Sequence, residues 1–199
     1  MDLSEKVNMI GRLYLGLEQI EECPEFSALI PEVRTNFVYA SKDSTTSEDI
    51  LAVDGRISVV DGFPKAIGKI KFGASGYMAH LLLEIRKKDP EVRSIIDFAN
   101  NPDIAEFLKA YCKEKGWDFS AVDRRFEPEN LKDLEGEAIS WKVEEAVRAA
   151  GGKMPRIFYE TGAVGKEPVS IFLGKDPLEI AEEMCELART YHESKQRTR

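Results

Sequence analysis

Residues 56–88 of the chain read RISVVDGFPKAIGKIKFGASGYMAHLLLEIRKK, and this stretch decides the fold class. Arg56–Asp61 and Lys65–Phe72 are rich in residues that favour strands. The turn sequence Asp61-Gly62-Phe63-Pro64 between them predicts two adjacent antiparallel strands. From Ser75 to Lys88 the apolar side chains recur at helical spacing, which predicts an amphipathic helix that ends before Pro90. A strand pair that leads directly into a helix indicates an α/β protein.

The same spacing arguments extend over the rest of the chain. Further helices are predicted over Ser4–Glu21, from Ser47 to Gly55, and over Asn101–Gly116, Ile139–Ala150 and Asp176–His192, with the tail fraying from Arg189. Further strands are predicted over Thr35–Ser41, Val92–Phe98, Trp117–Val122, Arg156–Glu160 and Val169–Gly174. Short turns join several strands, so we expect a mixed or largely antiparallel sheet. No linker is long enough to divide the chain, and residues 1–199 are predicted to form a single domain.

The composition argues against several classes of function. The net charge of −8 opposes binding to nucleic acid or to an anionic membrane, so neither is expected as a partner of the chain by itself. No signal-peptide pattern and no apolar stretch long enough to span a bilayer are present, which predicts a cytoplasmic protein. Only two histidines are present and the three cysteines lie far apart, so a histidine triad, a multi-histidine metal site and a disulfide are not expected.

The turn Lys71-Phe72-Gly73-Ala74-Ser75-Gly76 has the composition of an anion site. It places a lysine and uncrowded backbone N–H groups at the start of a helix, where the helix dipole favours negative charge. Phosphate or pyrophosphate is the ligand that this arrangement suits. The alternative is an ordinary strand-to-helix connection in which Ser75 caps the helix.

Three further clusters, Asp54-Gly55-Arg56-Ile57, Asp123-Arg124-Arg125 and Gly165-Lys166-Glu167-Pro168, are also polar or basic and lie beside apolar runs. Together with the turn, and in this order, they resemble the archaeal thiamine-phosphate synthase domain of the ThiN type. The resemblance runs from about Val7 to Ala181. It implies a three-layer αβα sandwich similar in outline to class II aldolases, a topology that the sequence pattern alone would not give.

In that family the domain is usually fused behind a hydroxymethylpyrimidine phosphate kinase, or behind a helix-turn-helix in regulators. The family reaction joins hydroxymethylpyrimidine diphosphate to a thiazole phosphate, forming thiamine phosphate and releasing pyrophosphate. The resemblance therefore implies a transferase with phosphorylated thiamine precursors as small-molecule partners and without an organic cofactor. The resemblance also leaves open a longer protein in which this chain follows a kinase or a DNA-binding domain. The apolar face of the first predicted helix, which could belong to the core or to an interface, leaves open a homodimer.

The resemblance and the residue chemistry together suggest a site. Arg56 stands where synthase-type members carry a functional arginine, and its guanidinium suits a phosphate. Phosphate or substrate contacts are expected from Lys71, Gly73, Ala74, Ser75, Asp123, Arg124, Gly165 and Lys166. For the basic residues the alternative is a solvated surface side chain.

Tyr77 departs from the family pattern, since synthase-type members carry a histidine at this position. Histidine can carry charge near neutral pH, whereas tyrosine, with a pKa of about 10, offers a neutral hydroxyl. One hypothesis is a synthase that uses Arg56 and tolerates Tyr77 as a catalytic residue. The other is a ligand-binding domain that has lost catalysis and senses thiamine phosphate or its precursors.

Mg²⁺ is a candidate cofactor because it often neutralises phosphate groups in enzyme sites. Glu160 and Glu167 are the carboxylates that could hold it. The alternative is that both are surface carboxylates without a ligand, so the metal ligands stay unassigned.

Overall fold

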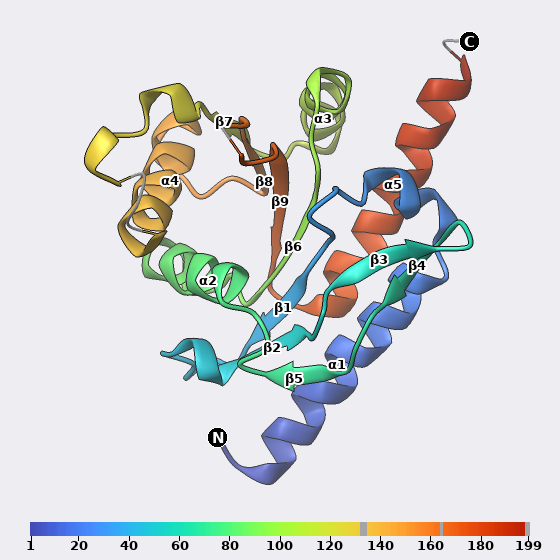
Figure 1. Cartoon of the computed structure of the whole chain (residues 1–199), viewed down its shortest axis with the longest axis vertical. Coiled ribbons are helices and arrows are strands. Elements are labelled where there is room, and N and C mark those ends of the chain that lie inside the picture. Colours follow the sequence, from blue (N-terminus) through green and yellow to red (C-terminus); the bar gives the residue numbers. More distant parts are fainter. Residues whose placement is uncertain (132–134, 164, 198–199) are drawn as a thin grey trace.

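The computed structural model describes residues 1–131, 135–163 and 165–197. A seven-stranded sheet lies at the centre of the molecule, with a two-stranded ribbon beside it (Figure 1). In spatial order the strands of the sheet are β5 (Ile70–Phe72), β2 (Ile50–Val53), β1 (Phe37–Ala40), β6 (Ser94–Ala99), β9 (Val169–Gly174), β8 (Ile157–Glu160) and β7 (Phe119–Val122). The ribbon pairs β3 (Ile57–Val60) with β4 (Phe63–Ala66).

Strand pairing in the sheet is antiparallel except at one edge, where β7 and β8 run parallel. At the centre, β6 and β9 pair from Ser94 opposite Gly174 to Ala99 opposite Val169. Both strands are buried along almost their whole length, as expected of strands covered on both faces. The prediction of a mixed, largely antiparallel sheet is confirmed.

Helices cover both faces of the sheet (Figure 1). One face carries α2 (Tyr77–Lys88) and α4 (Glu135–Ala149), and the other carries α1 (Leu3–Glu21), α3 (Pro102–Lys115) and α5 (Pro177–Arg197). Successive side chains on β6 alternate between the two layers. Ile95 therefore belongs to the core beneath α2 and α4, and Ile96 to the core beneath α1, α3 and α5. This is the expected three-layer αβα sandwich.

Short 3₁₀ segments connect some of these elements, namely η1 (Pro24–Leu29), η2 (Ser47–Asp49), η3 (Arg124–Phe126) and η4 (Glu129–Leu131). Local sequence sets the ends of α3 as predicted. The Asn101 side chain accepts a hydrogen bond from the N–H of Ile104 at 2.9 Å, and Gly116 ends the helix with φ of 68°.

The segment 47–55 is mainly a strand, so the prediction of a helix there was wrong. η2 is followed directly by β2, whose residues are all buried. β2 lies between β1 and β5 in the sheet. Pairing with strands elsewhere in the chain overrides the local preference of so short a segment.

Other boundaries also differ from the prediction, and α4 begins at Glu135 rather than at Ile139. Lys65–Phe72 forms two strands, because β4 pairs with β3 in the ribbon whereas β5 joins the sheet beside β2. α5 continues to Arg197 instead of fraying from Arg189, and Lys195 Nζ lies 2.6 Å from the carboxylate of Asp103, which lies on α3. None of the described helices is both long and apolar enough to cross a bilayer.

Candidate active site

A cavity of about 450 Å³ lies where β8 ends and α2 begins, on the side of the sheet that α2 and α4 cover. Its positively charged lining residues are Arg56, Arg124, Lys142 and Lys166. Its negatively charged lining residues are Asp97, Glu160 and Glu167. Side chains of both signs therefore share one cavity, and their partners decide which of them a ligand could contact.

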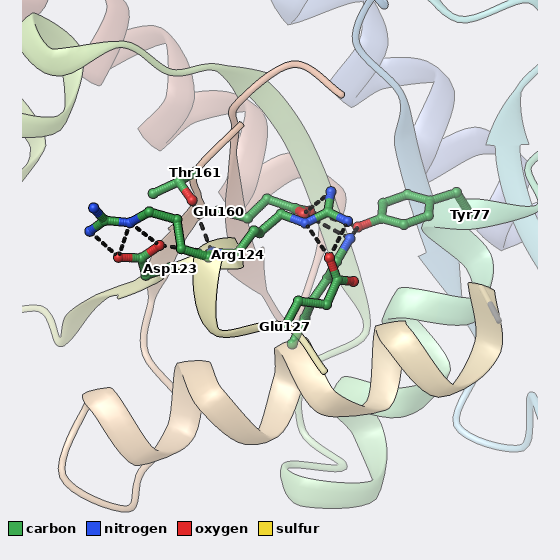
Figure 2. A network of polar contacts seen from close by, with 8 residues as sticks. Tyr77, Asp123, Arg124, Glu127, Glu160 and Thr161 are labelled. Carbon is green, nitrogen blue, oxygen red and sulfur yellow. Dashed lines mark hydrogen bonds and ion pairs between the residues drawn. The ribbon is translucent and has the colours of Figure 1, made fainter. Parts of the chain in front are cut away.

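Glu160 lies at the centre of a buried polar network (Figure 2). Its side chain is 4% exposed, and Oε1 accepts a hydrogen bond from the Tyr77 hydroxyl at 2.7 Å. Oε2 lies 2.7 Å from Nζ of Lys142 and 3.3 Å from NH1 of Arg124. Burial of a carboxylate is costly unless donors and cations surround it, and two cations and a hydroxyl do so here.

Arg124 is held from several directions at the start of η3. Its backbone N–H donates to Oγ1 of Thr161 at 2.9 Å. Its Nε and NH2 groups donate to Oε2 of Glu127 at 3.1 and 2.7 Å, and NH1 faces Glu160 (Figure 2). Most of its donors are therefore used within the protein. Through its contact with Glu160, Arg124 connects η3 to the end of β8.

Tyr77 and Lys142 meet at the cavity wall, one from the start of α2 and the other from α4. Lys142 Nζ donates to the Tyr77 hydroxyl at 2.9 Å and lies 4.9 Å from the ring centre. Burial, followed by the charge of Glu160, raises the pKa of Tyr77 well above its usual value, so its hydroxyl stays neutral. Burial also lowers the pKa of Lys142, against the opposing effect of Glu160. Of these two residues, only Lys142 can carry a positive charge.

Asp97 lies on β6, and its carboxyl group lines the cavity. The residue is 7% exposed, and Oδ1 accepts a hydrogen bond from the backbone N–H of Asn36. Burial raises the pKa of Asp97 to about 7, although the Asn36 N–H and the charge of Arg56 oppose this. A buried carboxyl group that lines a cavity and has a strongly raised pKa is a candidate functional residue.

Arg56 approaches the cavity from the turn between β2 and β3. Its NH1 donates to the carbonyl oxygen of Val33 at 2.6 Å, and its φ is 69°. Arg34 has a similar φ of 68°, and both arginines line an adjoining hollow of about 380 Å³. Positive φ is uncommon outside glycine and often marks functional backbone.

Residues 74–77 at the start of α2 line the same hollow. No side chain caps this helix, so its first N–H groups suit an anion.

Most of the residues predicted from the sequence lie together. Those that line the main cavity are Arg56, Ser75, Tyr77, Arg124, Gly165 and Lys166, and Ala74 lines the adjoining hollow. Ser75 does not cap α2, because the N-cap position is Gly76. The neighbour of Gly165, Val164, lies outside the described residues.

Lys71 and Gly73 do not line either hollow. Lys71 forms an ion pair with Asp54 instead. Gly73 has φ of 69°, and a Cβ atom at this position would meet the carboxylate of Glu48. The glycine therefore meets a local steric need of the turn.

Asp123 also lies outside the lining of both hollows. It caps η3 by accepting a hydrogen bond from the N–H of Arg125 at 3.0 Å, and its carboxylate pairs with the Arg125 side chain. Figure 2 shows Asp123 on the opposite side of the Arg124 backbone from Tyr77. Its direct role in this structure is to shape the turn that presents Arg124.

The cavity also contains Asp97 and Lys142, which were not predicted, and Arg34 lines the adjoining hollow. A signal for Asp97 was present, since an acid inside a predicted inner strand needs a reason to be buried. Lys142 and Arg34 gave no such signal, because charged residues on an amphipathic helix or in a loop are usually solvated.

The two carboxylates considered for Mg²⁺ are already engaged. Glu160 contacts Tyr77 and Lys142, and Glu167 accepts hydrogen bonds from the backbone N–H groups of Glu32 and Val33 at 3.0 Å each. Across residues 1–131, 135–163 and 165–197, no three His, Cys, Asp or Glu side chains gather as metal ligands would. This arrangement does not fit a metal held by these carboxylates.

Comparison with known proteins decides the family. The family model for thiamine-phosphate synthase ThiN matches residues 12–186. The thiamine-phosphate synthase ThiN of Methanothermobacter thermautotrophicus is 37% identical over 184 residues, which is 92% of this chain and 94% of that protein. The chain belongs to the ThiN family. Membership implies a part in thiamine biosynthesis.

ThiN domains also occur within longer proteins. The bifunctional thiamine biosynthesis protein ThiDN of Methanocaldococcus jannaschii is 31% identical over 166 residues, which is 82% of this chain but 37% of that protein. The solved C-terminal domain of a phosphomethylpyrimidine kinase is 36% identical, with a TM-score of 0.84 over 92% of this chain and 99% of that domain. These relatives support the expectation that a ThiN domain can be fused to a kinase.

A more distant structure shares the fold alone. L-fuculose-1-phosphate aldolase from Thermus thermophilus is 18% identical, with a TM-score of 0.53 over 94% of each chain. The expected outline of a class II aldolase is therefore confirmed for this ThiN chain.

Proposed function

We propose that this ThiN-family chain is a thiamine-phosphate synthase, which condenses hydroxymethylpyrimidine diphosphate with a thiazole phosphate to give thiamine phosphate and pyrophosphate. The observation that carries the proposal is one cavity in which Arg56 and the uncapped start of α2 lie beside the buried cation Lys142. The similarity to the thiamine-phosphate synthase ThiN of Methanothermobacter thermautotrophicus, which extends over 92% of this chain, supports the same conclusion.

The reaction needs positive charge near the leaving group. Breaking the C–O bond of the diphosphate leaves a polyanion, which cationic side chains and N–H donors stabilise. Arg34, Arg56 and the start of α2 line the hollow that suits this diphosphate. Lys166 lines the main cavity, and its side chain has no partner among the described residues, so it is available to the phosphate of the thiazole.

Tyr77 is compatible with this chemistry because the bond exchange needs no proton from it. The C–O electron pair leaves with pyrophosphate, and the lone pair of the thiazole nitrogen forms the new C–N bond at the same methylene carbon. Tyr77 is held by Glu160 at 2.7 Å and by Lys142 at 2.9 Å. The cationic role of the family histidine therefore passes to Lys142, and Tyr77 orients it.

The second candidate function is a sensor of thiamine phosphate or its precursors. The observation in its favour is that the Tyr77 hydroxyl already donates to Glu160, so its proton is not free for a substrate. Such a domain would bind these phosphates through Arg56 without turning them over.

The deciding experiment is a synthase assay on the purified protein with both substrates, run with and without Mg²⁺. Turnover is expected in the wild type. We expect Arg56→Ala to lower kcat/KM by about 10²- to 10³-fold, the usual loss when one charge-stabilising group is removed. Absence of turnover in the wild type, with turnover in Tyr77→His, would overturn the synthase and support the sensor.

Arg125→Ala is the matched control for Arg56→Ala. Arg125 is an exposed arginine paired with Asp123, and it does not line the cavity. Its replacement is expected to leave turnover within about twofold, because it keeps the buried network intact. Equal losses in both variants would contradict a specific role for Arg56.

A further inference from the structure

Asp97 has fewer hydrogen-bond and ion-pair partners than the other acidic residues that line the cavity. Glu160 is surrounded by Tyr77, Lys142 and Arg124. Glu167 accepts hydrogen bonds from two backbone N–H groups of the loop that precedes β1. Both carboxylates are therefore occupied by the protein itself.

One oxygen of Asp97 has no partner from another residue. Oδ1 accepts from the N–H of Asn36, whereas Oδ2 has no hydrogen bond and no ion pair to another residue within the described part of the chain. The residue is 7% exposed and lines the cavity, where this oxygen can accept a hydrogen bond from a ligand.

The position of this oxygen is rigid. Asp97 lies within β6, paired with Ile171 of β9 on one side and with its N–H bonded to Asn36 on the other. Its carboxyl is also fixed by the Asn36 N–H. A group on a central strand with a fixed rotamer suits recognition of a rigid, planar ligand.

The ligand that fits is a planar base with adjacent donor and acceptor sites, not an anion. Asp97 can accept an N–H bond as a carboxylate, and it can also donate once protonated. Burial raises the pKa of Asp97 to about 7, so both forms are accessible near neutral pH. An aminopyrimidine matches this pair, because its amino group donates beside a ring nitrogen that can accept or carry a proton.

We propose that Asp97 binds the aminopyrimidine ring of the diphosphate substrate through the amino group and the adjacent ring nitrogen. The inference rests on the proposed synthase function, whose substrate carries this ring. Arg56 and Tyr77 line both hollows, so a ring at Asp97 in the main cavity leaves its diphosphate free to reach the start of α2. The carboxyl then also stabilises the positive charge that develops on the ring as the C–O bond breaks.

The test compares hydroxymethylpyrimidine phosphate with its analogue in which hydrogen replaces the amino group, by calorimetry. The wild type is expected to bind the amino compound about 10- to 100-fold more tightly, as for a hydrogen bond to a charged group. Asp97→Asn is expected to reduce this preference to less than about threefold, because the amide oxygen stays with the Asn36 N–H and the NH2 group, which is a donor, then faces the amino group of the ligand. Equal binding of the two compounds by the wild type would overturn the proposal, whatever the variant does.

Inorganic pyrophosphate is the control ligand, and Asp61→Asn is the control variant. Pyrophosphate binding should be unchanged in Asp97→Asn, since it uses the cations. Asp61 is an exposed aspartate in the β3–β4 turn with φ of 50°, which asparagine tolerates, so its replacement should leave the preference intact. The proposal is wrong if Asp97→Asn folds but still prefers the amino compound. It is also wrong if the variant loses pyrophosphate binding as strongly as it loses binding of the amino compound.

Turnover separates this inference from the function on which it rests. If the protein shows no synthase activity but retains an Asp97-dependent preference for the amino compound, the inference stands and the synthase fails. If the protein is a synthase and Asp97→Asn changes neither the KM for the pyrimidine diphosphate nor the amino preference, the synthase stands and the inference fails.

Discussion

Tyr77 connects α2 to the rest of the buried network through a single oxygen. Its hydroxyl donates to Glu160 and accepts from Lys142, at 2.7 and 2.9 Å. We expect Tyr77→Phe to lower the free energy of unfolding by about 1–3 kcal/mol, because both partners lose a buried hydrogen bond. Urea denaturation measures this. Tyr159→Phe is the control: no hydrogen bond of the Tyr159 hydroxyl is described, so a similar loss there would contradict the assignment.

Asp97 makes the stability of the protein depend on pH. Burial raises its pKa to about 7, whereas an aspartate in the unfolded chain has a pKa of about 3.9. Between these values the folded state binds more protons than the unfolded state, so stability is greatest below about pH 4 for this group and falls as the pH rises to about 7. Arg56 lessens the shift and Glu160 increases it.

The measurement is the free energy of unfolding of wild type and Asp97→Asn at several pH values. The variant lacks this titration, so its stability relative to the wild type is expected to rise by up to about 4 kcal/mol between pH 4 and pH 8. A difference between the two proteins that stays constant over this range would contradict the burial of Asp97 as an acid.

At the scale of elements, α1 packs against α5 and β1 at a glycine. A Cβ atom on Gly16 would lie 2.8 Å from the carbonyl oxygen of Pro177 and 3.3 Å from the ring of Phe37. Because the nearest atom belongs to backbone, the two helices would have to move apart. We expect Gly16→Ala to destabilise the fold by about 1–3 kcal/mol, measured as a lower urea midpoint.

Gly11 on the same helix is the matched control. A Cβ atom there meets nothing within 4 Å, and the residue has ordinary helical backbone. Gly11→Ala should stabilise the protein by about 0.5–1 kcal/mol, because alanine loses less conformational freedom in a helix. The two substitutions should therefore change stability in opposite directions, and changes of the same sign would contradict the packing of α1.

At the scale of the whole molecule, the buried charges connect elements that are distant along the chain. Lys142 on α4 and Glu160 on β8 lie 2.7 Å apart, with side chains at most 5% exposed. Lys142→Met and Glu160→Gln should each cost about 3–5 kcal/mol, because each leaves buried charges unbalanced. The double variant should cost at least about 1 kcal/mol less than their sum, since Arg124 and Glu127 then remain as a balanced pair.

A double-mutant cycle by urea denaturation measures this coupling. Arg148 and Glu145 provide a control ion pair on α4, where the Arg148 side chain is 73% exposed. Its coupling should be at most about 1 kcal/mol, because water screens exposed pairs. Equal coupling energies for the two pairs would contradict the burial of the Lys142–Glu160 pair.

Most of the site could be predicted from the sequence, but not all of its chemistry. Arg56, Tyr77 and Lys166 were predicted for the site from the family resemblance, and they line the cavity. Lys71 was predicted from a local motif, yet it pairs with Asp54 outside the cavity. A motif gives the chemistry of a side chain. The direction in which that side chain points depends on the strand that carries it and on nearby charges.

The elements whose signals are local could be predicted from the sequence. The cap at Asn101, the stop at Gly116 and the helical spacing after Ser75 each act over a few residues, so they survive without tertiary context. Together with the turn-joined strands they were enough for the α/β class.

Which distant residues meet depends on the tertiary structure. β2 is a strand because β1 and β5 pair with it, and Lys142 lines the candidate cavity because folding brings it to Tyr77 and Glu160. The free oxygen of Asp97 likewise depends on its neighbours across the sheet and cavity. Such contacts join residues far apart in the chain, and their energies come from burial and pairing, which local spacing does not encode.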